Sequence, residues 1–253
     1  MSRHSGSQTQ TEKTRQMNIE QHIKQKFNKA LRNYNLISQG DRILVGLSGG
    51  KDSLCLLELL AQRSKIFHPQ FFVEALHVRM ENIKYESNTH YLDTFCESLG
   101  VKLHVITTSF NEETPPNKRK KPECFLCSWA RRKVLFRFAQ DHNFNKIALG
   151  HHQDDIIHTT LMNLFYESSF SAMPISLKYN KMPITLIRPL CIVREDDIRS
   201  YAALRGYEPL LKACPFEHDT IRTTISQWYR ELETANPEIR HSVWKAIERS
   251  ALE

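Results

Sequence analysis

The segment Ser48–Ser53, which reads Ser-Gly-Gly-Lys-Asp-Ser, is the feature that most constrains how this chain folds. It follows the apolar run 43–47 and precedes the leucine-rich stretch 54–60, so it predicts a glycine turn from a strand into a helix. A helix N-terminus presents backbone N–H groups that bind phosphate. A Walker A loop needs a longer spacing before its Gly-Lys pair and a hydroxyl residue where Asp52 stands. The segment therefore predicts a phosphate-binding loop of another class.

Alternating strands and helices follow this loop, and they predict a doubly wound parallel five-stranded α/β sheet with helical N- and C-terminal extensions. The expected strands are 43–47, 71–78, 102–107, 146–149 and 185–187, and the expected helices among them are 54–60, 89–99 and 134–141. Because such sheets bind ligands at the carboxyl ends of their strands, the site is expected beside the loop at 48–53.

The chain is expected to divide into four parts. A disordered, polar and basic tail (1–16) precedes an amphipathic helix (17–38), a nucleotide-binding core (39–215) and a C-terminal helical segment (216–253). The chain has no apolar run near the roughly 18–20 residues of a membrane span, and its first residues lack a secretory signal. We therefore expect a cytoplasmic protein that does not associate with a membrane.

The chain has a formal net charge of +7 at pH 7. Its basic residues are concentrated near the N-terminus and in the run 118–121. Basic runs of this kind are ordinarily a solvated surface. Beside a nucleotide-binding loop they also indicate contacts to the phosphates of a large RNA.

The cysteines indicate a metal or redox site. Cys124 and Cys127 form a CxxC pair, expected on one side of a tight turn, but no second CxxC completes a zinc site. Cys214 precedes a proline, a setting shared with one ligand of bacterial ferredoxin clusters, so three cysteines suit a [4Fe–4S] cluster with one open iron. Thioredoxin-type redox chemistry and partial zinc binding are alternatives. The other cysteines are interpreted as core residues: Cys55, Cys96 and Cys191.

The loop resembles, residue for residue, the SGGxDS signature of the PP-loop pyrophosphatase superfamily, whose members adenylate a carbonyl or carboxylate and release pyrophosphate. The order of five motifs is similar to that of the tRNA 2-thiocytidine biosynthesis protein (TtcA) family. These motifs are SGGKDS (48–53), CxxCSxxRR (124–132), LGHHxDD (149–155), RPL (188–190) and a late Cys-Pro (214–215).

This resemblance implies a tRNA-cytidine 2-sulfurtransferase that adenylates the C2 oxygen of a tRNA cytidine, at position 32, and replaces it with sulfur. It implies ATP, Mg²⁺ and a [4Fe–4S] cluster as cofactors, with Cys124, Cys127 and Cys214 as the cluster ligands. The implied partners are tRNA and a sulfur donor such as a cysteine desulfurase, and a homodimer is a further expectation. One departure concerns Cys214, which lacks the second cysteine that some relatives carry nearby.

The implied site residues follow from the matched motifs. The pyrophosphate would be bound by backbone N–H groups and hydroxyls, Lys51 would neutralise the α-phosphate and Asp52 would hold Mg²⁺. The residues of this cradle are Ser48, Gly49, Gly50, Lys51, Asp52 and Ser53. Together with Lys51 and Asp52, the expected catalytic residues are Asp155, Cys124 and Cys127.

Further along the chain, Gly150 would let the nucleotide approach closely and Asp155 would orient the base or bind the metal. Capping of the next helix is the alternative role for one of the adjacent carboxylates, Asp154 and Asp155. His77 would border the adenosine pocket or be an ordinary satisfied histidine. Arg131 and Arg132 face either RNA phosphates or solvent.

Three other functions remain open from the sequence. The first is another PP-loop tRNA modification, namely 2-thiouridine or lysidine synthesis. The second is a non-catalytic ATP- and RNA-binding module with a structural metal. The third is a thiol–disulfide protein, which would lack iron–sulfur absorbance.

Overall fold

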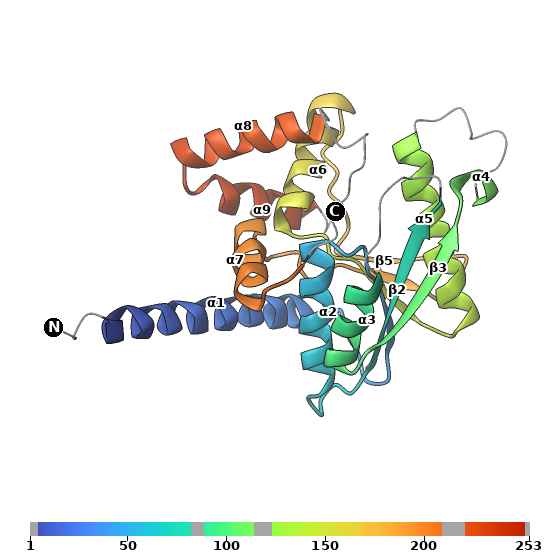
Figure 1. The fold of residues 1–253 in the computed structure, drawn as a ribbon. Coiled ribbons are helices and arrows are strands. Elements are labelled where there is room, and N and C mark those ends of the chain that lie inside the picture. Colours follow the sequence, from blue (N-terminus) through green and yellow to red (C-terminus); the bar gives the residue numbers. More distant parts are fainter. Residues whose placement is uncertain (1–4, 82–88, 114–122, 209–220, 251–253) are drawn as a thin grey trace.

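The computed structural model describes residues 5–81, 89–113, 123–208 and 221–250 (Figure 1). Its single sheet has the strand order β3-β2-β1-β4-β6-β5, in which every neighbouring pair is parallel except β5 and β6. The strands are β1 (Arg42–Gly46), β2 (Phe72–Met80), β3 (Lys102–Thr108), β4 (Lys146–Ala148), β5 (Ser176–Lys178) and β6 (Thr185–Ile187).

The predicted α/β class is confirmed, but the strand count was wrong by one. The five predicted strands are the parallel ones, and β5 adds an antiparallel edge strand beside β6. Its three residues are all exposed, so it carries none of the apolar alternation by which a strand is recognised in a sequence.

Helices surround the sheet. They are α1 (Ser5–Asn33), α2 (Lys51–Ser64), α3 (Thr89–Leu99), α4 (Phe110–Glu113), α5 (Glu123–Asp141), α6 (Gln153–Tyr166), α7 (Glu195–Arg205), α8 (Ile221–Ala235) and α9 (Ile239–Ser250). Each helix in the described part of the chain is too short or too polar to cross a membrane.

Three helices begin earlier than predicted: α2 begins three residues before the expected stretch 54–60, and two others begin about ten residues early. Residues 5–16, expected as a disordered tail, lie within α1, whose sequence contains no proline and is rich in Gln, Glu, Lys and Arg, which favour helix. The helix predicted over 134–141 begins at Glu123, because residues 123–141 contain neither Gly nor Pro and bury an apolar residue at each turn.

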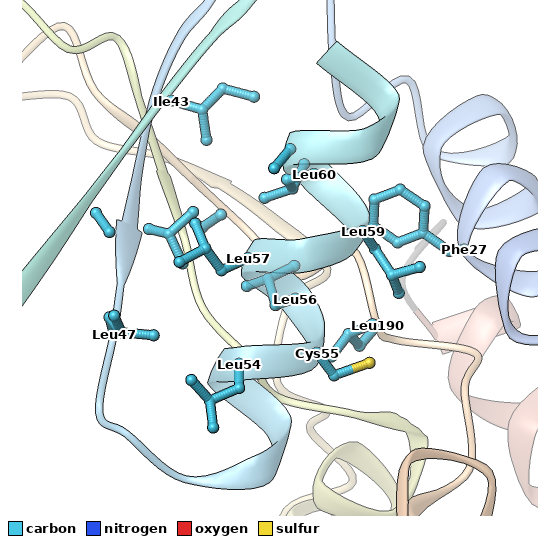
Figure 2. Close-up of a cluster of buried hydrophobic side chains, with 14 of the residues drawn as sticks. Phe27, Ile43, Leu47, Leu54, Cys55, Leu56, Leu57, Leu59, Leu60 and Leu190 are labelled. Atoms are coloured by element: carbon cyan, nitrogen blue, oxygen red, sulfur yellow. The ribbon is translucent and has the colours of Figure 1, made fainter. Parts of the chain in front are cut away.

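Alternation along β1 divides the core into two layers. Ile43 and Val45 pack with α1, α2, α3 and α7, whereas Leu44 packs with α5 on the opposite face. Figure 2 shows the first layer, in which Leu56 and Leu57 of α2 lie between β1 and Phe27 of α1. The core leucines of α2 are almost fully buried, and each such burial contributes up to about 1.5–3 kcal/mol to folding.

A third apolar cluster attaches the C-terminal helices to the core. Ile156 and Ile157 of α6 pack with Tyr229 of α8 and with Trp244 and Ile247 of α9. Through these contacts α8 and α9 are held against α6, at the end of the sheet where the site is expected (Figure 1).

The centre of the sheet is its topological switch point. β1 and β4 are neighbours, but the chain continues from β1 toward β2 and β3 and from β4 toward β6. The connections that follow β1 and β4 therefore flank one crevice at the carboxyl edge of the sheet, where open α/β sheets bind their ligands.

Candidate active site

The loop after β1 forms the strand–turn–helix connection that the sequence predicts. Gly49 has φ +82°, a conformation that favours glycine, and α2 begins two residues later at Lys51. The N–H groups of Ser53 and Leu54 donate to the Gly50 carbonyl at 3.1 Å. Lys51 and Asp52 have no preceding helical turn to accept from their N–H groups, which are therefore available to an anion.

Two serines close this loop. The Ser48 and Ser53 hydroxyl oxygens lie 3.1 Å apart, and the Ser53 hydroxyl donates to the Gly50 carbonyl at 2.9 Å. The predicted phosphate cradle is thus assembled by the chain itself, with both hydroxyls beside the helix N-terminus. Phosphate binding at these residues stays a prediction.

Lys51 lies between two carboxylates from different elements. Its Nζ is 3.2 Å from the Asp52 carboxylate and 3.1 Å from Oε1 of Glu195, the first residue of α7. Burial lowers the pKa of Lys51, but the two carboxylates outweigh burial and raise this pKa above its ordinary value. Burial raises the pKa of Glu195, and Lys51 outweighs it and lowers that pKa. Both groups are therefore charged at neutral pH.

Asp52 has a carboxylate oxygen suited to a cation. Its buried Oδ1 accepts no hydrogen bond from the described residues, although the Lys51 ammonium lies 3.2 Å away. An oxygen atom of this kind is a ligand that Mg²⁺ prefers. The donor therefore fits the predicted metal, whose presence stays a prediction.

Gly150 has a packing role that the sequence did not predict. A Cβ atom at this position would lie 3.0 Å from the Asp52 carbonyl carbon and 3.1 Å from Ser53 N, both of them backbone atoms. The missing side chain therefore lets the loop after β4 pack directly on the first turn of α2. Gly150 is required for packing against the phosphate loop, and its contact with a nucleotide stays untested.

The two adjacent aspartates of α6 differ in their partners. Asp155 closes a capping box: its Oδ2 accepts from the His152 N–H at 3.0 Å, and its own N–H donates to His152 Nδ1 at 3.4 Å. Its Oδ1 accepts from Arg222 of α8 at 2.9 Å. The capping role expected for one of the aspartates thus belongs to Asp155, whose role in catalysis stays a prediction.

Asp154 links three helices. It accepts from Arg240 of α9 at 2.6 Å and from the backbone N–H of Glu195 at 2.8 Å. Burial raises the pKa of Asp154, but the Arg240 guanidinium outweighs burial and holds this pKa below its usual value. Asp154 therefore serves the structure, by joining the N-termini of α6 and α7 to α9.

His77 is a satisfied core histidine, and its place beside an adenosine pocket stays a prediction. It is buried, and its Nδ1 lies 2.8 Å from the Leu47 carbonyl, so it is a satisfied core histidine. It also lines a largely apolar cavity of about 150 Å³ next to the phosphate loop. The other lining residues include Ser48, Leu135, Arg131 and Arg132. The cavity therefore lies beside the loop at 48–53, and its occupation by the base of a nucleotide stays a prediction.

The cysteine pair lies in the first helical turn of α5, so the predicted tight turn was wrong. Cys124 is exposed and Cys127 is buried beside Leu126. The i,i+3 spacing places both thiols on one face, and the positive end of a helix favours the thiolate form that binds iron. Two ligands of the implied cluster therefore fit. Cys214 lies outside the described residues.

The remaining cysteines are confirmed as core residues. Cys55, Cys96 and Cys191 are buried. Burial raises the pKa of Cys96 and of Cys191 to about 12, and burial also raises the pKa of Cys55 well above its ordinary value. Burial and a raised pKa make these three thiols unreactive.

Several residues of the site were not predicted. Glu195, Arg222 and Arg240 belong to α7, α8 and α9 and reach the loop only through the fold. No local sequence signal marks them, since charged residues in a predicted helix are ordinarily solvated.

A family model described as a PP-loop domain matches residues 18–209. The chain belongs to the PP-loop family. This PP-loop chain is 35% identical to tRNA-cytidine(32) 2-sulfurtransferase 1 of Francisella tularensis subsp. tularensis (strain WY96-3418), over 94% of its own length and 89% of the relative. It is 32% identical to tRNA-cytidine(32) 2-sulfurtransferase of Shewanella woodyi (strain ATCC 51908 / MS32), over 94% and 75% of the two chains. The resemblance stated from the motifs is confirmed.

Solved structures agree with the assignment to the PP-loop family. The U34-tRNA thiolase NcsA of Methanococcus maripaludis, solved with its [4Fe-4S] cluster, superposes with a TM-score of 0.77 at 25% identity, covering 92% of this chain and 79% of that one. NMN synthetase of Francisella tularensis has a TM-score of 0.53 at 14% identity, over 85% and 86% of the two chains, so it shares the fold alone.

Proposed function

We propose that this PP-loop protein is an ATP-dependent tRNA thiolase that replaces the C2 oxygen of a cytidine, at position 32, with sulfur. The names of the two sulfurtransferase relatives support the substrate. The single structural observation that carries the proposal is the course of α5. Its first turn bears Cys124 and Cys127, and its next turn bears Arg131 and Arg132, which line the cavity beside Ser48 of the phosphate loop. One helix thus joins the thiols to the nucleotide pocket.

The chemistry takes place in two steps. The cytosine O2 attacks the α-phosphorus of ATP, the bond to the β-phosphate oxygen breaks and pyrophosphate leaves. Sulfur at the oxidation level of sulfide then adds to C2, the C2–O bond breaks, and its electron pair leaves with AMP. The first step develops negative charge on the α-phosphate, which Lys51 and the N–H groups at the start of α2 are placed to stabilise.

The residues present suit the two groups that the family implies. Asp52 would hold Mg²⁺ through the oxygen that accepts no hydrogen bond from the described residues, which would add positive charge at the phosphates. Cys124, Cys127 and Cys214 would hold a [4Fe–4S] cluster, which leaves one iron without a protein ligand and so able to carry sulfur.

The same proposal covers the partners. A cysteine desulfurase would supply the sulfur, and a cytoplasmic location would bring the protein together with tRNA. A homodimer stays a prediction. Exposed Arg132 of α5 lines the cavity and is a candidate for contacts with the RNA backbone, as is the exposed Lys133 that follows it in the helix.

The test is mass spectrometry of tRNA nucleosides after anaerobic reconstitution with ATP, Mg²⁺, sulfide and unmodified tRNA. The expected product is 2-thiocytidine, formed with one pyrophosphate per sulfur. A tRNA without sulfur would overturn the proposal. The likeness to NcsA favours 2-thiouridine synthesis as a second candidate, and 2-thiouridine in place of 2-thiocytidine would decide for it.

The Cys124→Ala/Cys127→Ala variant separates thiolation from the other functions. It is expected to bind ATP as the wild type does and to form no thionucleoside, whereas the matched Cys96→Ala variant of a core thiol is expected to retain thiolation. Thiolation by the α5 variant would exclude a role for the cysteine pair. ATP binding without pyrophosphate release in the wild type would identify a non-catalytic module.

A further inference from the structure

The phosphate-binding lysine is already engaged by a carboxylate from a distant helix. Glu195 Oε1 lies 3.1 Å from Lys51 Nζ, and the two residues are the first residues of α7 and α2. Both side chains are about one-quarter exposed, so the pair is partly screened from water. A phosphate that binds at the start of α2 must compete with Glu195 for the same ammonium.

Glu195 itself is fixed in place by the fold. Its backbone N–H donates to Asp154 Oδ2 at 2.8 Å, and Asp154 in turn accepts from Arg240 at 2.6 Å. The start of α7 is therefore tied to α6 and α9. The carboxylate consequently stays beside the phosphate loop in the absence of any ligand.

When a phosphate separates Lys51 from Glu195, the ammonium and the carboxylate each keep another charged partner. Glu195 Oε1 also lies 3.1 Å from Arg199, and its Oε2 lies 3.9 Å from Arg230. Lys51 keeps Asp52 at 3.2 Å. Because an unpaired charge is the main cost of breaking a partly buried ion pair, this arrangement makes the exchange of carboxylate for phosphate inexpensive.

We propose that Glu195 is a positioning residue for Lys51, holding its ammonium on the α7 side of the loop until a nucleotide phosphate displaces the carboxylate. This exchange lowers the affinity for ATP and makes it depend on the partners of Glu195. The inference rests on the proposed function, because it concerns the lysine assigned there to the phosphate.

The main test is isothermal titration calorimetry with Mg²⁺ and an ATP analogue that has a methylene bridge between its α- and β-phosphates. Removing the competing charge in Glu195→Gln is expected to tighten binding roughly 3- to 10-fold. The matched control is Asp196→Asn, which makes the same charge change in the same turn, on a side chain that is 70% exposed and contacts Arg199 at 3.5 Å. It is expected to change affinity less than about twofold.

Two further variants separate this role from a merely structural one. Arg199→Gln removes the alternative partner of Glu195, so it is expected to weaken binding, in the opposite direction to Glu195→Gln. In a Lys51→Met background, the Glu195→Gln change is expected to have no effect on affinity, since the two residues act through one contact. Adenosine, which has no phosphate, is expected to bind wild type and Glu195→Gln alike.

Unchanged or weaker binding by Glu195→Gln, with the wild type binding normally, would overturn this inference and leave the proposed function intact. Equal effects of Glu195→Gln in the wild-type and Lys51→Met backgrounds would overturn it as well. No binding of the analogue by the wild type would contradict the proposed function itself, and this inference with it.

Discussion

The two sides of the candidate site are built differently. On the phosphate-loop side, defined by the first turns of α2, α6 and α7, every helix start is tied to another by a charged or backbone contact, such as Lys51–Glu195 and Asp154–Glu195 N. On the cysteine side, defined by the first turn of α5, Cys124 is exposed and Cys127 packs into an apolar cluster. The phosphate-loop side is therefore preorganised by ionic contacts, whereas the cysteine side places one thiol at the surface and packs the other in an apolar cluster.

This comparison predicts that substitutions on the phosphate-loop side cost stability and those at Cys124 do not. The free energy of unfolding measures the difference. Four predictions follow the comparison from the largest expected effect on that quantity to the smallest.

Replacing Asp154 should cause the largest loss in the free energy of unfolding. Asp154→Ala leaves the Glu195 N–H without its acceptor and leaves the largely buried Arg240 with Glu233 as its remaining carboxylate partner, so we expect a loss of about 2–3 kcal/mol in urea unfolding. Asp196→Ala, on the same edge but 70% exposed, should cost less than about 0.5 kcal/mol. Similar values for the two variants would show that Asp154 does not join the helices.

Adding a methyl group at Gly150 tests the packing of the two loops. In Gly150→Ala the new Cβ would lie 3.0–3.1 Å from backbone atoms of Asp52 and Ser53, which cannot move without displacing the phosphate loop. We expect a loss of about 1–3 kcal/mol together with weaker ATP binding. Unchanged affinity with reduced stability would indicate that the loop absorbs the displacement without altering the phosphate site.

Acid should lower the free energy of unfolding through His151, which lies in the loop before α6. Burial, with Arg188 next, lowers the pKa of His151 to about 4, and Arg188 Nε donates to its Nδ1 at 3.3 Å. Between the unfolded pKa, about 6.5, and the folded value, the unfolded chain binds a proton that the folded protein does not, so stability falls as pH falls through this range.

As pH falls from 7 to 5, protonation of His151 in the unfolded chain should lower the free energy of unfolding of the wild type by about 2 kcal/mol. The His151→Gln variant should not show this loss. Chemical denaturation at both pH values measures the difference. Parallel losses in the two proteins would assign the acid sensitivity to other groups.

The smallest effect is expected on the cysteine side. Cys124 is exposed, so Cys124→Ser should change the free energy of unfolding by less than about 0.5 kcal/mol. The matched Cys127→Ser should cost more, about 1–2 kcal/mol, because it places a hydroxyl in the apolar cluster around Leu126. A large loss from Cys124→Ser would show that the first turn of α5 is held together by this thiol.

Local patterns predicted much of the molecule. Apolar runs identified the five parallel strands, and Gly49 with the following polar residues identified the phosphate loop, because both signals lie within a few neighbouring residues. Weak local signals failed: β5 is short and exposed, and the start of α5 contains the cysteines that were interpreted as a turn. The roles of Asp155 and His77 could be predicted only as alternatives. Their hydrogen bonds then showed that Asp155 caps α6 and that the His77 ring is satisfied by the Leu47 carbonyl.

The sequence by itself determined the fold class, the phosphate loop and the family, since these depend on residues that are adjacent in the chain. Only the tertiary structure decided that Gly150 packs on the loop, that Asp154 joins three helices and that Glu195 engages Lys51. These contacts join residues far apart in sequence, and their strength comes from burial and from the distance between charges, which no spacing along the chain reveals.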